Sequence, residues 1–558
     1  MSPKVVKKKK KKIRSFAGGG SAVETSSLRP VHVEKRPPCL DTCPSQNDIR
    51  SVLTTILLSE KHNRTIDESL TKAFEIFSET TPYPSICGRV CPHPCETGCN
   101  RGEKEGPVAI NSMERYVGDF ALKNKLQYKK SEESYSEKIA VIGSGPAGMS
   151  CAYQLAKRGY PVTVFEAFPK AGGMLRYGIP AYRLPREVLD AENQRILDLG
   201  VELKTDTAVG KDIPYEDLQK EYKAIFVGIG AHQGKKLGLE GEDASNLWTG
   251  TEFLNKANRG ESIEVGDHVV VIGGGDTAVD AARVSRRIGA KVTILYRRTR
   301  VEMPAIEEEI TGAEEEGVDL VLLAAPAELI RSNGKVTGMV CQRMELGEPD
   351  DSGRRRPVPI EGDTYEMECS TVVAAISQEP DFTGFENLRE GRDWIKADEF
   401  GHSMIDNIYA GGDALDLGLV TIAIYQGRRA AETIHRELRG LPFEEENEKK
   451  IIKHEKMLLS YYEEKARNEA LHLDPETRLK DGDAEIASTF TDEQAAEEAA
   501  RCMSCGYCFD CGQCWSFCQD GAIKKPFIKG EIYTFKMDFC NGCKKCEEQC
   551  PSGFIEMH

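Results

Sequence analysis

Cysteine spacing at the two ends of this chain constrains its fold more than any other feature. Sixteen of the nineteen cysteines lie within residues 39–99 and 502–550. Near the C-terminus, the spacing Cys-x2-Cys-x2-Cys-x3-Cys occurs twice, in Cys508, Cys511, Cys514 and Cys518, and in Cys540, Cys543, Cys546 and Cys550. Thiolates surround cubane 4Fe-4S clusters with this spacing. A disulfide framework suits short secreted chains, so the pattern favours metal clusters in a reducing compartment.

The C-terminal repeat predicts a small α+β module like a two-cluster ferredoxin, over residues 501–558. In such modules the fourth cysteine of each run binds the other cluster. The expected ligand sets are Cys508, Cys511, Cys514 and Cys550 for one cluster, and Cys540, Cys543, Cys546 and Cys518 for the other.

Charge and length limit the class of protein. The 558 residues suffice for three or four domains, and the net charge of −16 makes nucleic acid an unexpected partner. No apolar run approaches the length of a membrane span, and no apolar segment follows the N-terminal lysines, so a cytoplasmic protein is expected. The run Lys7–Lys12 is interpreted as a solvated tail, with a docking arm for an acidic partner as the alternative.

A first glycine fingerprint predicts an FAD site. Gly143, Gly145 and Gly148 follow a β-branched run directly, and the next such run ends in Glu166. Glycines let backbone N–H groups and a helix N-terminus approach a pyrophosphate, and the acid accepts hydrogen bonds from ribose.

A second fingerprint predicts a nicotinamide-nucleotide site at Gly273, Gly275 and Ala278. Here the following strand ends in Arg297 and Arg298 instead of an acid. Guanidinium groups grip a 2′-phosphate, so NADP(H) is favoured, while NAD(H) and ordinary surface charge stay open.

Residues 408–413 have the form of a strand that places Asp413 beside a flavin, and a helix from about Val420, which includes Thr421, would direct its N-terminus at the ring. The order is FAD fingerprint, inserted nucleotide domain and return. The fold class is therefore α/β, with two Rossmann-like dinucleotide-binding domains between a helical iron–sulfur domain and the ferredoxin-like module.

The expected domain boundaries follow from these motifs. They are a basic disordered tail at 1–35, a helical iron–sulfur domain at 36–130, an FAD-binding domain at 136–255 and 370–440, an NADP(H)-binding domain at 256–369, a helical linker at 441–500 and the ferredoxin-like module at 501–558. Helices are predicted over Asn47–Glu60, Asp67–Glu79 and Glu444–Ala470, and a capping box is predicted at Thr491 and Gln494.

Residues 36–440 resemble the small subunit of NADPH-dependent glutamate synthase. The resemblance is carried by 172–180 (GGMLRYGIP), 182–185 (YRLP), 296–298, 303–304 and the cysteine segment 87–99. Similar chains with a C-terminal ferredoxin domain accompany dissimilatory sulfite reductase or serve 2-oxoacid:ferredoxin oxidoreductases. The resemblance implies hydride transfer from a nicotinamide nucleotide to FAD, and a relay of electrons through N-terminal clusters.

The resemblance also assigns individual residues. It places Gly173 in the flavin site, and it implies that Glu114, after Gly106–Pro107, completes a cluster with Cys43, Cys91 and Cys95 while Cys87 does not ligate. Relatives carry an Arg-Cys-x-x-Cys pair just upstream of the position of Cys39, and this chain does not. Its one such motif is Arg501 to Cys505.

Counting then leaves four thiols: Cys39, Cys99, Cys502 and Cys505. One hypothesis is that they bind a fourth cluster jointly, and the alternative is three clusters with Cys502 and Cys505 idle. The expected function is an NAD(P)H:acceptor oxidoreductase that serves a partner redox enzyme or ferredoxin, either as a homodimer or within a larger complex, with no residue acting as general acid or base. The alternative is a non-catalytic electron-wiring subunit.

Overall fold

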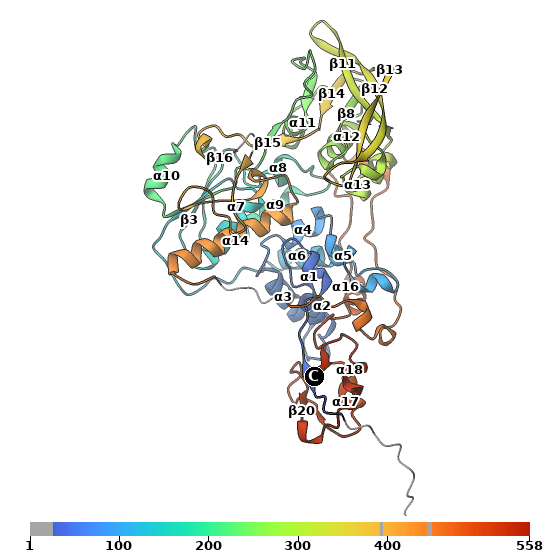
Figure 1. Ribbon diagram of the computed structural model, residues 1–558. Coiled ribbons are helices and arrows are strands. Elements are labelled where there is room, and N and C mark those ends of the chain that lie inside the picture. The colour runs from blue at the N-terminus through green and yellow to red at the C-terminus, as the bar shows by residue number, and fades with distance from the viewer. Residues whose placement is uncertain (1–25, 391–393, 444–448) are drawn as a thin grey trace, which may run out of the picture.

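The computed structural model describes residues 26–390, 394–443 and 449–558, and Figure 1 shows their arrangement. Two α/β domains lie at one end of the molecule, the N-terminal helical domain lies below them, and the small C-terminal module lies at the opposite end.

The N-terminal domain is a set of helices separated by cysteine-bearing turns: α1 (Pro38–Thr42), α2 (Ile49–Leu57), α3 (Ile66–Phe77), α4 (Pro84–Val90), α5 (Pro94–Thr97) and α6 (Ile110–Lys123). Helix α2 begins where the Asp48 side chain accepts from Ser51 N, and α3 begins with a capping box between Thr65 and Glu68. The two helices predicted from apolar periodicity are therefore confirmed, with ends shifted by one to three residues.

The first α/β domain has a five-stranded parallel sheet in the order β18-β5-β2-β3-β4. Its strands are β2 (Ile139–Ile142), β3 (Val162–Phe165), β4 (Glu202–Lys204), β5 (Ala224–Val227) and β18 (Ile408–Ala410). Its helices are α7 (Pro146–Lys157), α8 (Met174–Tyr177), α9 (Arg186–Leu197), α10 (Tyr215–Glu221) and α14 (Val420–Arg439). Fully buried strands of this kind need helices on both faces, and α7 and α14 pack against each other beside the sheet.

The second α/β domain has the parallel order β10-β9-β8-β14-β7. Its strands are β7 (Leu247–Thr249), β8 (His268–Ile272), β9 (Lys291–Tyr296), β10 (Val318–Leu322) and β14 (Thr371–Ala374), and its helices are α11 (Gly250–Asn258), α12 (Asp276–Ile288) and α13 (Glu307–Glu315). The expected boundaries at 255/256 and 369/370 are wrong, because β7 and β14 both pair within this second sheet.

Three small antiparallel sheets complete this region of the described chain. Strands β11 (Ala324–Ser332), β12 (Lys335–Pro349) and β13 (Arg355–Glu368) form a meander, and β16 (Arg389–Glu390) pairs with β17 (Trp394–Ile395). Strand β6 (Gln233–Gly234) pairs with β15 (Gln378–Glu379) where the chain crosses between the two α/β domains. The boundary between the two α/β domains therefore lies at β6 and β15, and not at the expected positions 255/256 and 369/370.

The N-terminal domain and the first α/β domain share one hydrophobic core, in which Phe74 and Tyr83 belong to the same buried cluster as Tyr153 and Ile424. The Tyr83 hydroxyl donates to Asn193 Oδ1 at 2.6 Å, and Glu192 accepts from the backbone N of Ser85 and Ile86. The two domains therefore hold a fixed orientation, because separating them would expose buried polar groups as well as apolar surface.

The C-terminal segment corrects two expectations. The helix predicted over Glu444–Ala470 is wrong for residues 449–470, which form only two single 3-10 turns, while 444–448 lie outside the described residues. This segment instead runs along the N-terminal domain, where residues such as Lys465 and Arg467 contact it through polar groups. Helices resume at α15 (Pro475–Lys480) and α16 (Asp492–Arg501), and the capping box of Thr491 and Gln494 is confirmed.

The C-terminal module contains α17 (Gln513–Ser516), β19 (Ile523–Lys524), β20 (Thr534–Phe535), α18 (Lys545–Glu548) and β21 (Ile555–Met557). Strand β1 (Pro30–His32) pairs antiparallel with β21. The interpretation of 1–35 as a tail is therefore wrong for residues 26–35, which belong to this module, and residues 1–25 lie outside the described range.

Candidate functional site

The first fingerprint forms a cavity of about 400 Å³ at the carboxyl ends of β2 and β3. Five of the predicted flavin residues line it: Gly143, Gly145, Glu166, Gly173 and Asp413. The backbones of Gly145 and Gly173 face each other so closely that a Cβ on Gly173 would lie 2.7 Å from the Gly145 Cα. Gly148 does not line the cavity. It lets the start of α7 pack closely against the fingerprint turn, because a Cβ there would lie 1.9 Å from Gly143 O. These features fit a pyrophosphate cradle made of backbone.

The acidic groups of this cavity lie in different environments. Glu166 is buried and accepts hydrogen bonds from Ser144 N at 2.9 Å and Phe168 N at 2.8 Å. Burial raises the pKa of Asp413 to about 6, although Gly418 N donates to its Oδ1. Sequence reasoning missed His232, which lines the cavity and whose pKa burial lowers to about 4. Its place two residues after Gly230, at the end of β5, was the available signal.

Thr421 lies at the start of α14, outside the cavity lining, and faces the N-terminal domain. Its carbonyl accepts a hydrogen bond from Ser45 Oγ at 3.0 Å. Its buried hydroxyl makes no close hydrogen bond, yet it lies near enough to the Cys91 thiol to oppose the rise in pKa that burial causes there. Thr421 therefore joins the flavin domain to the first cysteine group.

That first group contains Cys43, Cys91, Cys95 and Glu114, as the resemblance implied. The groups influence one another: burial raises the pKa of Cys43 to about 11, and the Glu114 carboxylate adds to this rise. Burial and the nearby Glu192 raise the pKa of Glu114 to about 8, opposed by a hydrogen bond from Asn47 Nδ2 at 3.0 Å. A buried carboxyl among three thiols has the chemistry of a mixed ligand set.

A second group brings the two ends of the chain together. Cys39 and Cys99 line one cavity with Cys502 and Cys505. The wall also contains Arg50, which donates from Nη1 to the carbonyl of Cys505 at 3.2 Å. Asn100 Nδ2 lies 3.5 Å from the Cys505 sulfur. Hydrogen bonds to sulfur and a nearby cation are features of cluster sites.

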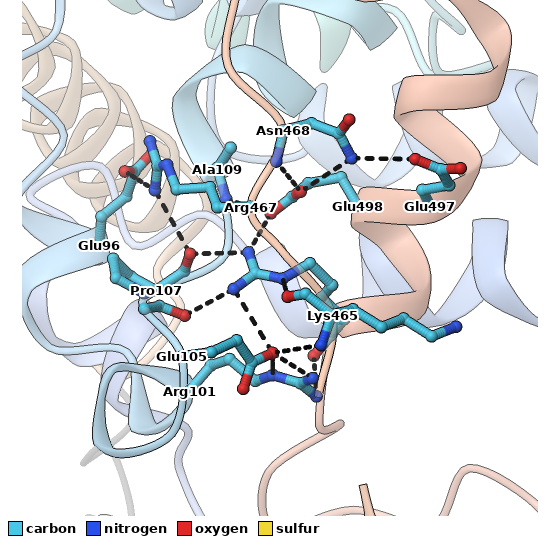
Figure 2. Close-up of polar contacts among 12 residues, drawn as sticks. Glu96, Arg101, Glu105, Pro107, Ala109, Lys465, Arg467, Asn468, Glu497 and Glu498 are labelled. Carbon is cyan, nitrogen blue, oxygen red and sulfur yellow. Dashed lines mark hydrogen bonds and ion pairs between the residues drawn. The ribbon is translucent and has the colours of Figure 1, made fainter. Parts of the chain in front are cut away.

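Polar contacts beside this second group hold α16 against the N-terminal domain (Figure 2). The guanidinium of Arg501 is fully buried and donates to the carbonyls of Pro107, Gly106 and Lys465 at 2.8–3.0 Å. It also pairs with Glu498 at 2.6 Å. Glu498 accepts in turn from Ala109 N and Asn468 N. Because Cys502 follows Arg501 directly, this network fixes where the C-terminal thiols enter the cavity.

The ferredoxin-like module contains two further groups. One cavity is lined by Cys508, Cys511, Cys514 and Cys550, and another by Cys518, Cys540, Cys543 and Cys546. These are the crossed sets expected from the spacing. All nineteen cysteines are free thiols.

No group of three or more His, Cys, Asp or Glu side chains in the described ranges is close enough to hold a single metal ion. A cubane is itself a cage with its ligands at the corners, so its thiolates stand farther apart than those around one ion.

The structure places the residues predicted to bind the nicotinamide nucleotide in different environments. Gly273 has φ +145°, and a Cβ there would lie 2.2 Å from Ala375 O. Gly275 precedes α12 and Ala278 is buried within it. Arg297 is exposed, whereas Arg298 is buried and donates to Asp350 Oδ2 at 2.6 Å and to the carbonyl of Arg355 at 2.7 Å. Of these two arginines, Arg297 is therefore the one that is available to a phosphate.

Comparison with known proteins agrees with this site. Residues 137–427 match the family model of pyridine nucleotide-disulphide oxidoreductases, 20–126 that of dihydropyrimidine dehydrogenase domain II with its 4Fe-4S cluster, and 533–556 that of a 4Fe-4S binding domain. The chain is 38% identical over 543 residues to the NADPH-Fe(3+) oxidoreductase subunit beta of Geobacter sulfurreducens. The matched region covers 88% of this chain and 79% of the relative.

Two other relatives share less of the chain. The NADP(+)-dependent formate dehydrogenase subunit beta of Moorella thermoacetica is 41% identical over 434 residues, covering 72% of this chain and 60% of that one. The small chain of NADPH glutamate synthase from Escherichia coli is 36% identical over 393 residues, covering 65% and 82%.

Fold, site and relatives together define an NAD(P)H oxidoreductase that depends on FAD and iron–sulfur clusters and passes electrons to a redox partner. The chain belongs to the pyridine nucleotide-disulphide oxidoreductase family. The expectations of fold class and enzyme class are confirmed. Among the described residues, no helix is both long and apolar enough to cross a bilayer.

Proposed function

We propose that this protein oxidises NADPH at its flavin site and passes the electrons singly through four 4Fe-4S clusters to a partner. The observation that carries the proposal is the contact between Ser45 and Thr421, because it joins the start of the flavin-domain helix α14 to the turn beside Cys43. FAD, when bound, supplies the conversion between hydride and single electrons. The protein's own residues bind the cofactors and hold them at fixed positions.

The proposed ligands follow the four groups. Cys43, Cys91, Cys95 and Glu114 would hold the cluster nearest the flavin domain, and Cys39, Cys99, Cys502 and Cys505 would hold a second cluster jointly. The crossed sets of the C-terminal module would hold the third and fourth. The sixteen ligands then use every cysteine near the chain ends except Cys87, which is buried beside the Thr81 hydroxyl.

The proposal of a joint site is supported by the buried ion pair of Arg501 and Glu498 that lies beside it. Burying the charged pair Arg501 and Glu498 requires that nearly every hydrogen bond be satisfied, and the contacts of Figure 2 meet this condition. A network of this kind has a reason to exist if α16 must present Cys502 and Cys505 to Cys39 and Cys99 at one fixed distance. Idle thiols would need no such precision.

NADPH is proposed over NADH because Arg297 directly follows β9, where the adenosine ribose lies in dinucleotide-binding folds, and Arg297 is exposed. The relatives named above carry NADPH or NADP(+) in their names and are subunits or chains of larger enzymes. We therefore also propose that this protein works as one subunit of a larger redox assembly.

Anaerobic titration of the purified holoprotein with NADPH tests the function. We expect bleaching of the flavin absorbance, followed by electron paramagnetic resonance signals from reduced clusters. Two glycines of positive φ, Gly273 after β8 and Gly289 after α12, give a matched pair: Gly273→Ala should abolish reduction by NADPH but not by dithionite, because its Cβ would meet Ala375 O. Gly289→Ala carries the same backbone strain of a positive φ but its Cβ would meet nothing within 4 Å, so NADPH should reduce this variant as it reduces the parent. A flavin that NADPH does not bleach would contradict the proposal.

A further inference from the structure

The chain crosses twice between the two α/β domains. It leaves the first domain at β6 and returns at β15, and these two-residue strands pair with each other. A connection of two short paired strands can act as a hinge, because few residues need to change conformation when one domain pivots. Other contacts must therefore set the orientation of the second domain, and with it the position of a bound nicotinamide nucleotide relative to the flavin site.

A buried ionic junction lies between the two domains. Arg183 of the first domain pairs with Asp280 of α12 at 2.8 Å, and both side chains are only 5% exposed. Arg183 also pairs with Glu309 of α13 at 3.1 Å. The Tyr182 hydroxyl donates to Asp280 Oδ1 at 3.3 Å, and the Arg287 guanidinium lies 3.9 Å from the centre of the Tyr182 ring. A pivot of the second domain would separate these partners and leave buried charges unpaired, which is strongly destabilising.

The linker between α14 and α16 reaches the same junction. Leu473 N donates to the carbonyl of Ile486 at 2.9 Å, with α15 between the two residues. We call residues 471–488 the linker hairpin. Ile486 N donates in turn to the carbonyl of Tyr182 at 3.1 Å. Figure 1 shows this part of the chain running between α16 and the second α/β domain. The linker hairpin therefore lies against the first domain's half of the junction.

The tip of the linker hairpin carries a buried arginine that contacts the second domain. Arg478 of α15 pairs through Nη1 with Glu315 of α13 at 2.8 Å, and its side chain is only 6% exposed. The same nitrogen lies 3.9 Å from Glu316, which is fully buried and pairs with Arg287 at 2.6 Å. A cavity of about 690 Å³ lies between the linker hairpin and the two domains, and Tyr182 and Arg287 line it. Because this space is not filled by side chains, the polar contacts of Arg478 connect the hairpin to the second domain.

The base of the linker hairpin is anchored to the N-terminal domain. Glu485 pairs with Arg89 of α4 at 2.7 Å and with Arg115 of α6 at 2.8 Å. Arg115 Nη2 also donates to the carbonyl of Ala487 at 2.8 Å. The N-terminal domain shares its hydrophobic core with the first α/β domain, so this anchor is fixed relative to the flavin site. The linker hairpin thus spans from a fixed body to the second domain.

We propose that the linker hairpin is a brace that holds the second α/β domain in the orientation used for hydride transfer, with Arg478 as a positioning residue. The inference rests on the proposed function, in which NADPH loses a hydride, becomes NADP⁺ and passes both electrons to the bound flavin. No domain rotation accompanies this step, because rotation would break the buried pairs of Arg183 and Arg478 in every turnover. A displacement of about 1 Å between reacting groups can slow a reaction about a hundredfold, so a loosened brace should be visible in the rate.

Stopped-flow reduction of the flavin tests the brace, in anaerobic full-length holoprotein with varied NADPH. Arg478→Met should lower the limiting rate of flavin reduction about tenfold. The apparent Kd for NADPH should stay within twofold of the parent, because the nucleotide site itself is intact. Arg478→Lys keeps the charge and should recover the rate to within about threefold of the parent. Glu485→Gln loosens the other end of the brace and should lower the same rate about threefold.

A matched control and a second measurement separate positioning from general damage. Arg467 lies in the same linker and pairs with Glu96 of the N-terminal domain at 2.7 Å, so Arg467→Met should leave the rate of flavin reduction unchanged. Amide hydrogen exchange reports the hinge directly. In Arg478→Met, exchange in β6 and β15 should be at least about threefold faster than in the parent, because the hinge opens more often, while exchange in β2 and β3 should not change.

The outcomes separate this inference from the function on which it rests. If NADPH bleaches the flavin of the parent and Arg478→Met is reduced equally fast, the inference is wrong and the function stands. Faster reduction in Arg478→Met would show that the domain must leave this orientation to react, which also overturns it. Arg478→Lys as slow as Arg478→Met would show that the ion pair is not the cause.

Two further outcomes keep the inference open to refutation. If Arg478→Met does not fold, Glu485→Gln decides, and a parental rate in that variant rejects the brace. If NADPH does not bleach the flavin of the parent, the proposed function fails. Hydrogen exchange at β6 and β15 then decides separately, since exchange that is equal in the parent and Arg478→Met rejects the brace as well.

Discussion

Arg501 donates a hydrogen bond from Nη1 to the carbonyl of Pro107 at 2.9 Å, which links residues 394 positions apart in the chain. Pro107 precedes the helix that carries Glu114, and Arg501 precedes Cys502. One buried guanidinium therefore ties together the supports of two proposed clusters.

The first prediction concerns this guanidinium. Arg501→Met should destabilise the protein by about 3–5 kcal/mol, because Glu498 would be left buried without its cation. Adding Glu498→Gln should recover part of the loss, since the amide removes the buried charge and its single oxygen still accepts from one of the two backbone groups, Ala109 N or Asn468 N. The thermal unfolding midpoint of the holoprotein measures both changes. Equal midpoints for the single and double variants would show that the buried charge is not the cause.

The second prediction separates two arginines that the sequence could not distinguish. Arg297→Ala should raise KM for NADPH far more than for NADH, since one charge-assisted contact to a phosphate contributes about 1.5–3 kcal/mol. Arg298→Ala should affect both nucleotides alike, because Arg298 is held by Asp350 and the Arg355 carbonyl. Steady-state kinetics with each nucleotide decide. Equal efficiency of the parent with NADPH and NADH would remove the basis of this assignment.

The third prediction tests the carboxylate ligand. Glu114→Ala should cost about four iron atoms per chain or change one cluster's potential, because a cubane with three protein ligands is incomplete. Glu114→Cys should restore the iron with an altered potential, since thiolate is softer than carboxylate. Iron analysis and a redox titration measure these effects. An alanine variant that matches the parent in both would show that Glu114 is only a buried acid.

The fourth prediction uses pH. The pKa of Asp413 is raised to about 6 in the folded protein, against 3.8 for the ordinary group. Ionised Asp413 therefore costs about 3 kcal/mol of stability above pH 6, and the cost fades as pH falls towards 4. In flavin-free protein, Asp413→Asn should raise the free energy of unfolding at pH 7.5 and have little effect at pH 4. Denaturant titrations at the two pH values provide the test, and a pH-independent difference would contradict it.

Local signals predicted much of this structure. The spacing of Thr491 and Gln494 specified a capping box that depends only on neighbouring residues, and glycine spacing specified both fingerprints. The cysteine rhythm in the C-terminal module predicted two groups that the structure assembles, because thiol spacing there reflects one compact site.

Long-range pairing could not be predicted in the same way. Nothing local to Pro30–His32 indicates that it pairs with Ile555–Met557, and β7 and β14 lie far from the fingerprint of the sheet they join. The helix expected over Glu444–Ala470 failed where the charged side chains instead contact the N-terminal domain, as Arg467 does with Glu96. Arg298 resembled a phosphate ligand until the structure placed Asp350 beside it.

The central claim is that both ends of the chain share one cluster. Iron and acid-labile sulfide in anaerobically purified protein test it most directly. We predict about sixteen iron atoms per chain for four cubanes, falling to about twelve in the variant Cys502→Ala with Cys505→Ala. Cys341→Ala with Cys369→Ala, two buried thiols of the second α/β domain, should leave the count unchanged. About twelve iron atoms in the parent, with no loss in the Cys502 and Cys505 variant, would contradict the shared cluster.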